Sequence, residues 1–466
     1  MLSANEWAVQ QWAPVKLGDQ RRTQRAVEMG AKMAAHPEAS LPEQMQAPST
    51  LKAAYRLLND PAVTLEALIS PHCQQTRTAA GRTPVVLLVE DTTELDYTHH
   101  RSKKGLGPLG GKGSQQGLLL HSTLAIDPDT RAVLGLAHQQ VVVRQPTPKP
   151  EPLRTRSPEA QVWEVSAQAV GSPPPAAQWV HVGDRASDIF EFMVACRAQG
   201  KHFLVRAQRN RLLAWGAAAP LADQREAQAL MDYARTLPAA VGSAYTVPMP
   251  ARDQQAARVA TLAVQWAPVT IPPSRGAAPA ARQYGALPVW VIRAWEPDPP
   301  PAVEPLEWVL LTSWPVRGLA EAHRLVGWYS CRWINEDYHQ CLKTGCRIER
   351  SQLDEAADIA RLLGFSSLIA VRLLQLRQAA RHTPEIPATA LVEPLMVQVL
   401  AARQHTDWQA MTAEQFWHRV ARLGGHQGRR RDGPPGWRTV WRGWRYLSDL
   451  TEGARLFVSL PSSDTG

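Results

Sequence analysis

Between residues 84 and 206, short apolar runs alternate with helical patterns in a fixed order. A β-branched run at 84–91 is followed by strand candidates at 118–126 and 132–143. The next elements are a helix, a strand, a helix and a strand, at 158–170, 179–184, 187–199 and 202–206. This order of three strands, helix, strand, helix and strand predicts an α/β domain.

Two other parts of the chain depart from this pattern. Residues 208–315 contain alternating polar and apolar runs separated by proline-rich turns, which predicts a β-rich insertion. A long helix should follow at 319–343, and an apolar helical stretch begins at 353. We therefore expect a central domain over 79–350 and a helical C-terminal domain over 351–466.

The first 78 residues are predicted to be helical, with one helix over 20–35 and a second over 49–58. Basic side chains lie outside their apolar positions, and these are Arg21, Arg22, Arg25 and Arg56. The cations could contact a polyanion, or they could form the solvated faces of a small helical bundle.

Composition limits the class of protein. The 466 residues carry 51 Lys and Arg against 42 Asp and Glu, a net charge of +9, and 44% are hydrophobic. This length corresponds to two to four domains, and the hydrophobic content excludes a wholly disordered chain. Five cysteines make no disulfide framework, and neither a secretory signal nor a membrane-spanning run is visible. We expect a soluble cytoplasmic protein with a polyanion as a plausible partner.

Two aspartates follow apolar runs at the expected ends of strands. Asp91 ends the first strand and Asp184 ends the fourth, so each carboxylate should be half desolvated at the edge of the sheet. An acid at such a position is often only a helix cap, and this alternative stays open for each aspartate taken alone.

A polar stripe runs along the helix expected at 319–343, and it consists of Tyr329, Arg332, Glu336 and Lys343. At 100° per residue, the four side chains fall within an arc of about 60°. Arg332 and Glu336 are also spaced for an i,i+4 ion pair, so a surface ion-pair ladder is the alternative. A ladder does not explain a stripe that continues over four turns between tryptophans, whereas cations lying along phosphates beside a metal-binding carboxylate do.

Three acidic side chains that meet at one point repel one another unless cations neutralise them. Asp91, Asp184 and Glu336 could hold two Mg²⁺ ions, which stabilise the attacking and leaving oxygens of an in-line phosphoryl displacement. The cations of the helix would then hold the strand that is cut. The net charge agrees with a nucleic-acid substrate, although it could not have selected this mechanism.

The spacing Y-x2-R-x3-E-x6-K of the polar stripe resembles the YREK signature of bacterial insertion-sequence DDE transposases. The sequence is most similar to the Tn-five-like branch of the IS-four group. Shorter segments resemble that branch in the same order over nearly the whole chain, and they lie at 17–19, 21–23, 54–56, 90–93, 184–185, 203–206, 308–313, 370–377 and 421–425.

The resemblance implies a fold and a reaction. The central domain should be ribonuclease-H-like, interrupted by the β-rich insertion, with the DDE triad on Asp91, Asp184 and Glu336 and two Mg²⁺ or Mn²⁺ ions. The enzyme would be a cut-and-paste transposase that nicks the transposon end with water, forms and reopens a DNA hairpin, and joins the 3′-hydroxyl end to target DNA. It would act as a homodimer, paired through its C-terminal domain, at the bacterial nucleoid.

The resemblance also implies contacts with DNA next to the cut. Tyr329, Arg332 and Lys343 would bind phosphates there, and Arg206 would help to hold the DNA. Gln340 stands where this branch often carries a lysine, so phosphate contacts at that position should be weaker.

Further from the cut, Trp308 would stack on a flipped-out base, although it could instead be a core residue of the insertion. Recognition of the terminal inverted repeat would fall to the basic residues of the N-terminal helices, Arg21, Arg22, Arg25 and Arg56. The loop at 102–117 aligns poorly, so the resemblance implies nothing about it.

Three other classes of protein are alternatives. A zinc site at His339, Cys341 and Cys346 lacks the usual C-x2-C or H-x3-H spacing. A glycosidase could use paired carboxylates and tryptophans, but it would leave the Arg and Lys side chains of the stripe without a role. The main rival is a transposase-derived DNA-binding repressor that no longer cuts, although all three candidate metal ligands are present.

Overall fold

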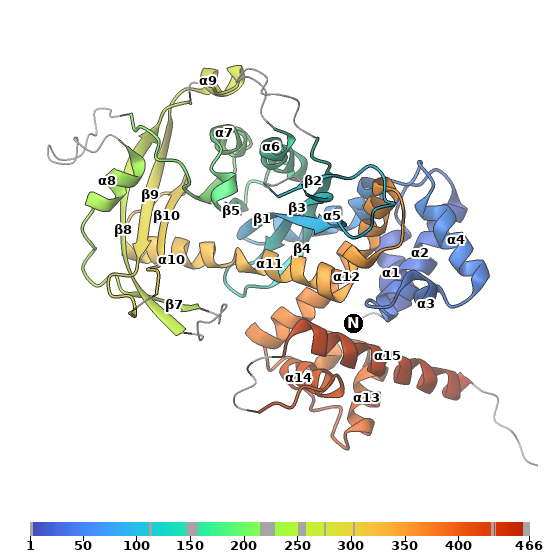
Figure 1. The fold of residues 1–466 in the computed structure, drawn as a ribbon. Coiled ribbons are helices and arrows are strands. Elements are labelled where there is room, and N and C mark those ends of the chain that lie inside the picture. Colours follow the sequence, from blue (N-terminus) through green and yellow to red (C-terminus); the bar gives the residue numbers. More distant parts are fainter. Residues whose placement is uncertain are drawn as a thin grey trace, which may run out of the picture.

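The computed structural model describes residues 3–110, 114–145, 157–214, 229–249, 258–274, 276–301, 303–429, 433 and 435–459. At the centre of this part of the chain lies a large mixed β-sheet with helices on both faces (Figure 1). The protein is therefore a mixed α/β protein, as the order of predicted elements indicated.

The central strands of the sheet are those predicted between residues 84 and 206. β1 (Val85–Asp96) pairs antiparallel with β3 (Gln115–Ile126) and parallel with β5 (Gln178–Gly183). β6 (His202–Arg206) pairs parallel with β5, and β4 (Val133–Val142) pairs with β3. Their Val and Leu side chains are buried on both faces of the sheet, which is why these strands read as continuous apolar runs.

The first strand is longer than predicted. β1 continues to Asp96, so Asp91 lies inside the strand and not at its end. The polar residues after Asp91 remain paired with β3, whereas the parallel pairing with β5 stops at Val89 and Val182. Asp91 therefore lies just beyond the last parallel pair. A short strand that was not predicted, β2 (Gly107–Leu109), also pairs with β3.

The β-rich insertion extends the same sheet. β10 (Glu307–Thr312) pairs with β6, and β9 (Leu287–Trp295), β8 (Arg258–Ile271) and β7 (Tyr245–Met249) follow outward (Figure 1). The strand order in the described residues is β2-β3-β1-β5-β6-β10-β9-β8-β7. Two short helices belong to the insertion, α8 (Leu230–Thr236) and α9 (Pro279–Tyr284).

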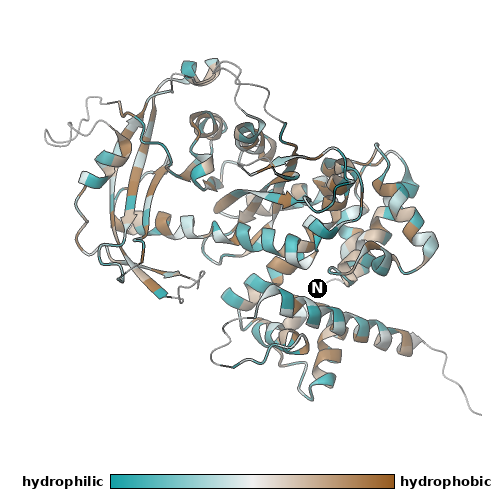
Figure 2. Ribbon diagram, viewed as in Figure 1, coloured by the Kyte–Doolittle hydropathy of each residue, from teal (hydrophilic) through white to brown (hydrophobic). Residues whose placement is uncertain are grey.

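Different helices cover the two faces of the sheet. α6 (Pro158–Val170) and α7 (Phe190–Ala198) pack on one face around a buried aromatic cluster. α10 (Leu319–Ser330) and α11 (Trp333–Gln340) run along the other (Figure 1). In Figure 2 the strands are mostly hydrophobic, whereas α11 is largely hydrophilic although it contacts β1. A polar helix against the sheet indicates a site and not only a core.

The predicted helix over 319–343 is not continuous. It breaks at Cys331, where the Ser330 hydroxyl and the Cys331 thiol both donate to the carbonyl of Gly327, at 2.6 and 3.8 Å. Such bonds from side chains compete with the helical backbone pattern. α11 then ends in a π-helical turn, Cys341–Gly345, which contains Lys343. The rotation of 100° per residue assumed for the polar stripe therefore applies within α10 and within α11. It does not apply across the break at Cys331 or into the π-helical turn.

The N-terminal helices pack as a bundle. The helices predicted over 20–35 and 49–58 are α2 and α4, and Asp19 caps α2 by accepting a hydrogen bond from the backbone N–H of Arg21 at 2.8 Å. Gly30 allows close packing, since a Cβ there would lie 2.2 Å from Trp12. The helices before the sheet are α1 (Ala4–Trp12), α2 (Gln20–Ala35), α3 (Leu41–Met45), α4 (Pro48–Leu58) and α5 (Leu65–Gly81).

The C-terminal helices share a core with the N-terminal bundle. They are α12 (Ala356–His382), α13 (Pro394–Arg403), α14 (Ala413–Leu423) and α15 (Trp437–Ser459). α12 is long and apolar enough to cross a membrane, but 78% of its most apolar window is buried inside the protein. Phe365 of α12 meets Trp12 with ring centroids 5.1 Å apart. All five cysteines are free.

Candidate functional site

Asp91 lies on the face of β1 that contacts α11. Its side chain is 16% exposed, and Oδ1 accepts a hydrogen bond from the backbone N–H of Thr92 at 2.9 Å. Desolvation raises the pKa of Asp91 to about 7; the Arg332 guanidinium opposes this shift, and the negative charges of Asp184 and Glu336 add to it. The negative charges of Asp184 and Glu336 therefore both act on the carboxylate of Asp91.

Asp184 directly follows β5. Its Oδ1 accepts a hydrogen bond from the backbone N–H of Ala186 at 2.8 Å and so caps a short 3₁₀ turn, Arg185–Ser187. Burial raises the pKa of Tyr329, and the charge of Asp184 adds to that shift. Asp184 therefore combines the capping role that the sequence left open with an electrostatic influence on the candidate site.

Arg332 bridges two of the acids. Its Nη2 lies 2.6 Å from Glu336 Oε1, and its Nη1 lies 3.7 Å from Asp91 Oδ2. The guanidinium is 12% exposed and lies over the ring of Trp333, 4.8 Å from the ring centroid. The i,i+4 ion pair left open as an alternative is therefore present. Its glutamate is 39% exposed, but its arginine has low exposure and lies beside Asp91, which a simple surface ladder does not require.

The donor set suits a divalent ion by its chemistry. Mg²⁺ prefers carboxylate oxygens, and the raised pKa of Asp91 shows that its negative charge is poorly compensated. Within the described ranges, no group of three His, Cys, Asp or Glu side chains is arranged to hold a metal ion. Glu336 instead pairs with Arg332, so binding of an ion by Glu336 requires that it exchange this partner.

Two side chains of α11 hold this helix against the sheet and beside Asp91. The sequence did not single out Asn335, and it offered His339 only as a candidate zinc ligand. Asn335 is buried, and its Nδ2 donates to one carbonyl of β1 and one of β3, both at 3.0 Å. Nδ1 of His339 lies 3.9 Å from Asp91 Oδ2, and burial lowers the pKa of His339 to about 3, so the ring is neutral. A polar residue beside Glu336 and a histidine one turn later were the signals available in the sequence.

Tyr329, Trp308 and Arg206 form a cluster beside these acids. Tyr329 and Trp308 are 4% and 3% exposed, and their rings meet edge to face with centroids 5.1 Å apart. Arg206 donates from Nη2 to the carbonyl of Glu307 at 2.8 Å and hydrogen-bonds the Tyr329 side chain. Trp308 is thus a core residue, which was the alternative to base stacking. Stacking stays a prediction that requires the ring to be uncovered.

Lys343 lies in the π-helical turn, outside the regular helix assumed for the polar stripe. Its Nζ is 3.7 Å from Glu349 Oε1, which also accepts a hydrogen bond from the backbone N–H of Asp96 at 3.0 Å. The Lys343 side chain is 30% exposed, and it lies near the end of β1, where a phosphate could reach its ammonium group.

Arg22 is engaged within the N-terminal bundle. Its Nε lies 2.7 Å from Asp60 Oδ2, and its Nη1 donates to the carbonyl of Leu17 at 3.0 Å. These contacts join the start of α2 to the segment after α4. The structure thus gives Arg22 a packing role, whereas the resemblance implied a contact with DNA.

The other predicted arginines of the bundle are more accessible. Arg21 and Arg56 are exposed and Arg25 is half-buried. Arg56 lines a shallow depression on α4 together with Lys52 and Tyr55. This depression combines cations with an aromatic ring, which suits a nucleic-acid backbone.

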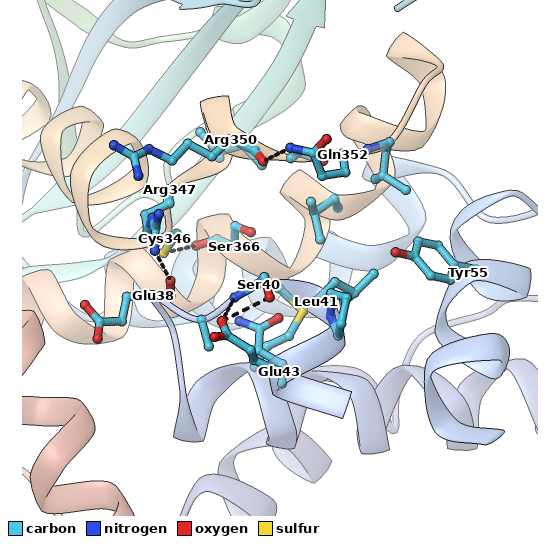
Figure 3. Close-up of a pocket in the computed structure, with 18 residues that line it drawn as sticks. Glu38, Ser40, Leu41, Glu43, Tyr55, Cys346, Arg347, Arg350, Gln352 and Ser366 are labelled. Atoms are coloured by element: carbon cyan, nitrogen blue, oxygen red, sulfur yellow. Dashed lines mark hydrogen bonds between the residues drawn. The ribbon is translucent and has the colours of Figure 1, made fainter. Parts of the chain in front are cut away.

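A cavity of about 540 Å³ lies where the bundle meets the segment after α11 (Figure 3). Ser40 and Tyr55 line one side, and Arg347 and Arg350 line the other. Arg347 adopts a left-handed backbone conformation with a φ of 50°, and its Nη1 donates to the carbonyl of Glu38 at 3.4 Å. The cavity thus places two exposed arginines beside the N-terminal helices.

Residues 4–63 match a family model described as transposase DNA-binding. The match covers α1 to α4 and supports a transposase, with DNA as the partner of this part of the chain. Among solved structures, the chain is similar to a piggyBac transposase in a synaptic complex with hairpin DNA, seen by cryo-EM. That similarity is weak: the identity is 10% and the TM-score 0.35, over 96% of this chain and 78% of the other.

Proposed function

We propose that this chain is a DNA transposase with an active site formed by Asp91, Asp184 and Glu336. The observation that supports the proposal is that the charges of Asp184 and Glu336, which are far apart in the sequence, both act on the desolvated carboxylate of Asp91. The match of residues 4–63 to a transposase DNA-binding family supports the same conclusion. The mixed sheet with helices on both faces is compatible with the ribonuclease-H-like fold that the resemblance implies.

The DNA end would lie on the exposed faces of α2 and α4. Arg21, Arg25 and Arg56 would bind phosphates there. DNA that continues toward the acids would pass the cavity in Figure 3, where Arg347 and Arg350 are exposed. This path connects the part of the chain that matches a DNA-binding family with the candidate active site.

In the proposed reaction, Asp91, Asp184 and Glu336 would hold two Mg²⁺ or Mn²⁺ ions, which would stabilise the charge on the attacking and leaving oxygens. Arg332, once it releases Glu336, would bind and orient a phosphate beside the cut, with Lys343 and Tyr329 next to it. The low exposure of Arg332 and Asp91 strengthens these electrostatic interactions, because little water screens them.

The finer steps follow from the YREK resemblance. A nick by water, a DNA hairpin, its reopening and the joining of the 3′-hydroxyl to target DNA would take place in a homodimer. The C-terminal helices would supply the contacts between the two copies.

A second function is favoured by one observation. The ion pair between Arg332 and Glu336 occupies one oxygen of the glutamate. If that pair persisted on DNA, the chain would bind transposon ends without cutting them and would act as a repressor.

Cleavage of DNA by the full-length chain separates these functions. Short inverted repeats that flank the gene would supply the substrate. We expect Mg²⁺-dependent nicking by the intact chain, and its loss in Asp91→Asn and in Glu336→Gln with DNA binding retained. Asp129→Asn, at an exposed acid in the turn between β3 and β4, is the control and should cut normally. Binding without cutting by the intact chain, in the presence of Mg²⁺ or Mn²⁺, would establish the repressor instead.

A further inference from the structure

On the other face of β1 from Asp91 lies a buried acid that the proposed reaction does not use. Glu90, His121 and His181 are all 0% exposed. His181 donates from Nδ1 to Glu90 Oε1, and Nε2 of His121 lies 3.3 Å from Glu90 Oε2. Nδ1 of His121 in turn accepts a hydrogen bond from the hydroxyl of Thr92 at 2.8 Å. A single carboxylate therefore links β1 to both of its neighbouring strands.

These links lie close in sequence to the two candidate aspartates. Glu90 directly precedes Asp91 on β1, and His181 lies near the end of β5, just before Asp184. Backbone pairing between β1 and β5 ends at Val89 and Val182. The hydrogen bond between Glu90 and His181 therefore joins the two strands where their backbone pairing ends.

Aromatic rings pack against both imidazoles, and burial acts against protonation of each. Burial lowers the pKa of His121 to about 3, and burial also lowers that of His181. Trp163 of α6 packs edge to face against His121, with ring centroids 4.7 Å apart. Phe192 of α7 packs in the same way against His181, at 5.7 Å. These rings hold the imidazoles beside Glu90, although Nε2 of His181 is buried without a hydrogen-bond partner.

An acid at this position is costly unless it has a specific role. Its neighbours on the same face of β1, Val86 and Leu88, belong to an apolar core, and an apolar side chain at position 90 would suit that core better. Buried polar networks whose members are hydrogen-bonded rigidify and specify the structure around them. A role in geometry therefore explains Glu90 better than a role in stability.

We propose that Glu90, His121 and His181 are a positioning cluster that sets the separation of Asp91 and Asp184, and thereby the affinity of this site for divalent ions. This inference rests on the proposed function. The cluster does not touch the reacting groups. It acts through the strands, because a shift of β1 against β5 moves one aspartate relative to the other.

Binding of Mn²⁺ to the full-length chain, measured by calorimetry, tests the proposal. Loss of partners that orient metal ligands costs about 10- to 100-fold in affinity, so Glu90→Gln should raise the Kd for Mn²⁺ about tenfold or more. The concentration of Mn²⁺ for half-maximal cleavage should rise in parallel, with the affinity for DNA unchanged. Glu191→Gln is the matched control, since Glu191 is a buried acid of α7 that accepts a hydrogen bond from the backbone N–H of Ala278 at 3.1 Å. Its Kd for Mn²⁺ should stay within about twofold of the wild-type value.

Each outcome decides the proposal. A folded Glu90→Gln variant with the wild-type Kd for Mn²⁺ would overturn it while the proposed function stands. An intact chain that neither binds Mn²⁺ nor cuts DNA would overturn the proposed function, and this inference with it. If Glu90→Gln does not fold, Thr92→Val decides, because it removes only the hydroxyl that contacts His121. A smaller rise in the Kd is expected there, and an unchanged Kd would reject the proposal.

Discussion

Arg332 holds Glu336 at 2.6 Å while its second amino group lies 3.7 Å from Asp91. A guanidinium in this position compensates two of the three carboxylates and competes with a divalent ion for their oxygens. The proposed reaction also gives Arg332 a phosphate to bind. The two roles make opposite predictions, because loss of the arginine should favour binding of the metal ion but slow the cleavage of DNA.

We expect Arg332→Ala to bind Mn²⁺ more tightly than the wild type but to cut DNA more slowly. A hydrogen bond to a charged group is worth about 1.5–3 kcal/mol, which corresponds to a loss of roughly 10- to 100-fold in the cleavage rate. Calorimetry with Mn²⁺ and single-turnover cleavage measure the two effects. Arg324→Ala is the control, because Arg324 is 46% exposed on α10 and pairs with Glu321 at 3.8 Å. Weaker Mn²⁺ binding by Arg332→Ala would show that the arginine supports the metal site.

The raised pKa of Asp91 predicts that, without bound metal ions, the free energy of unfolding decreases as the pH rises. Folding raises this pKa from 3.8 to about 7, so the folded state is favoured below 3.8 and loses that advantage as the pH rises through about 7. Asp91→Asn should therefore be more stable than the wild type at pH 8, by up to about 4 kcal/mol, and nearly equal to it near pH 4. Denaturant unfolding in EDTA measures the difference. Asp129→Asn should show no such gain, and a constant difference for Asp91→Asn at all pH values would refute the assignment.

Much of the fold could be predicted because its signals are local. α2, α6 and β6 have the bounds that the sequence indicated. Ser157, for example, caps α6 by accepting a hydrogen bond from the backbone N–H of Ala160 at 3.3 Å, which is a contact between residues close in sequence. Apolar runs likewise mark buried strands wherever both faces are covered.

The structure differs from the sequence predictions where contacts between distant residues or the chemistry of a side chain decide the conformation. Asp91 lies inside β1 because β3 keeps pairing with the polar residues that follow it. The break at Cys331 depends on bonds to the carbonyl of Gly327, which a helical projection does not contain. The burial of Trp308 depends on Tyr329. Pattern and resemblance together predicted a site of Asp91, Asp184 and Glu336. The structure shows that the charges of the other two act on Asp91, and the site and its metal ions stay a prediction.

A buried histidine connects the N-terminal bundle to the sheet and predicts sensitivity to acid. Nδ1 of His72, on α5, lies 2.8 Å from Gln11 Oε1, and its Nε2 accepts a hydrogen bond from the backbone N–H of Leu136 at 3.0 Å. Burial lowers the pKa of His72 to about 4 from 6.5. Stability from this residue is therefore present above pH 6.5 and is lost as the pH falls toward about 4, up to about 3 kcal/mol.

His72→Gln should abolish this part of the pH dependence. At pH 7.5 the variant should be about 1–3 kcal/mol less stable, because one amide group cannot replace both ring nitrogens, which contact Gln11 and the buried N–H of Leu136 on opposite sides. The difference from the wild type should shrink as the pH is lowered to 4, as measured by denaturant unfolding. His99→Gln, at an exposed position, serves as the control. A difference that does not change with pH would mean that His72 is protonated in the folded chain or contributes nothing by its charge.

Two arginines of the bundle that the resemblance treats alike should behave differently. Arg56 is exposed on α4, so Arg56→Ala should weaken binding to duplex DNA of any sequence and reduce the slope of log Kd against log salt concentration by about 1. Arg22 instead holds Asp60 and the carbonyl of Leu17, so Arg22→Ala should lower the midpoint of thermal unfolding more than it weakens DNA binding. Fluorescence anisotropy over a range of salt concentrations, together with thermal unfolding of both variants, makes each the control for the other. An Arg22→Ala chain with an unchanged melting temperature and the salt slope of Arg56→Ala would show that Arg22 leaves Asp60 to bind a phosphate.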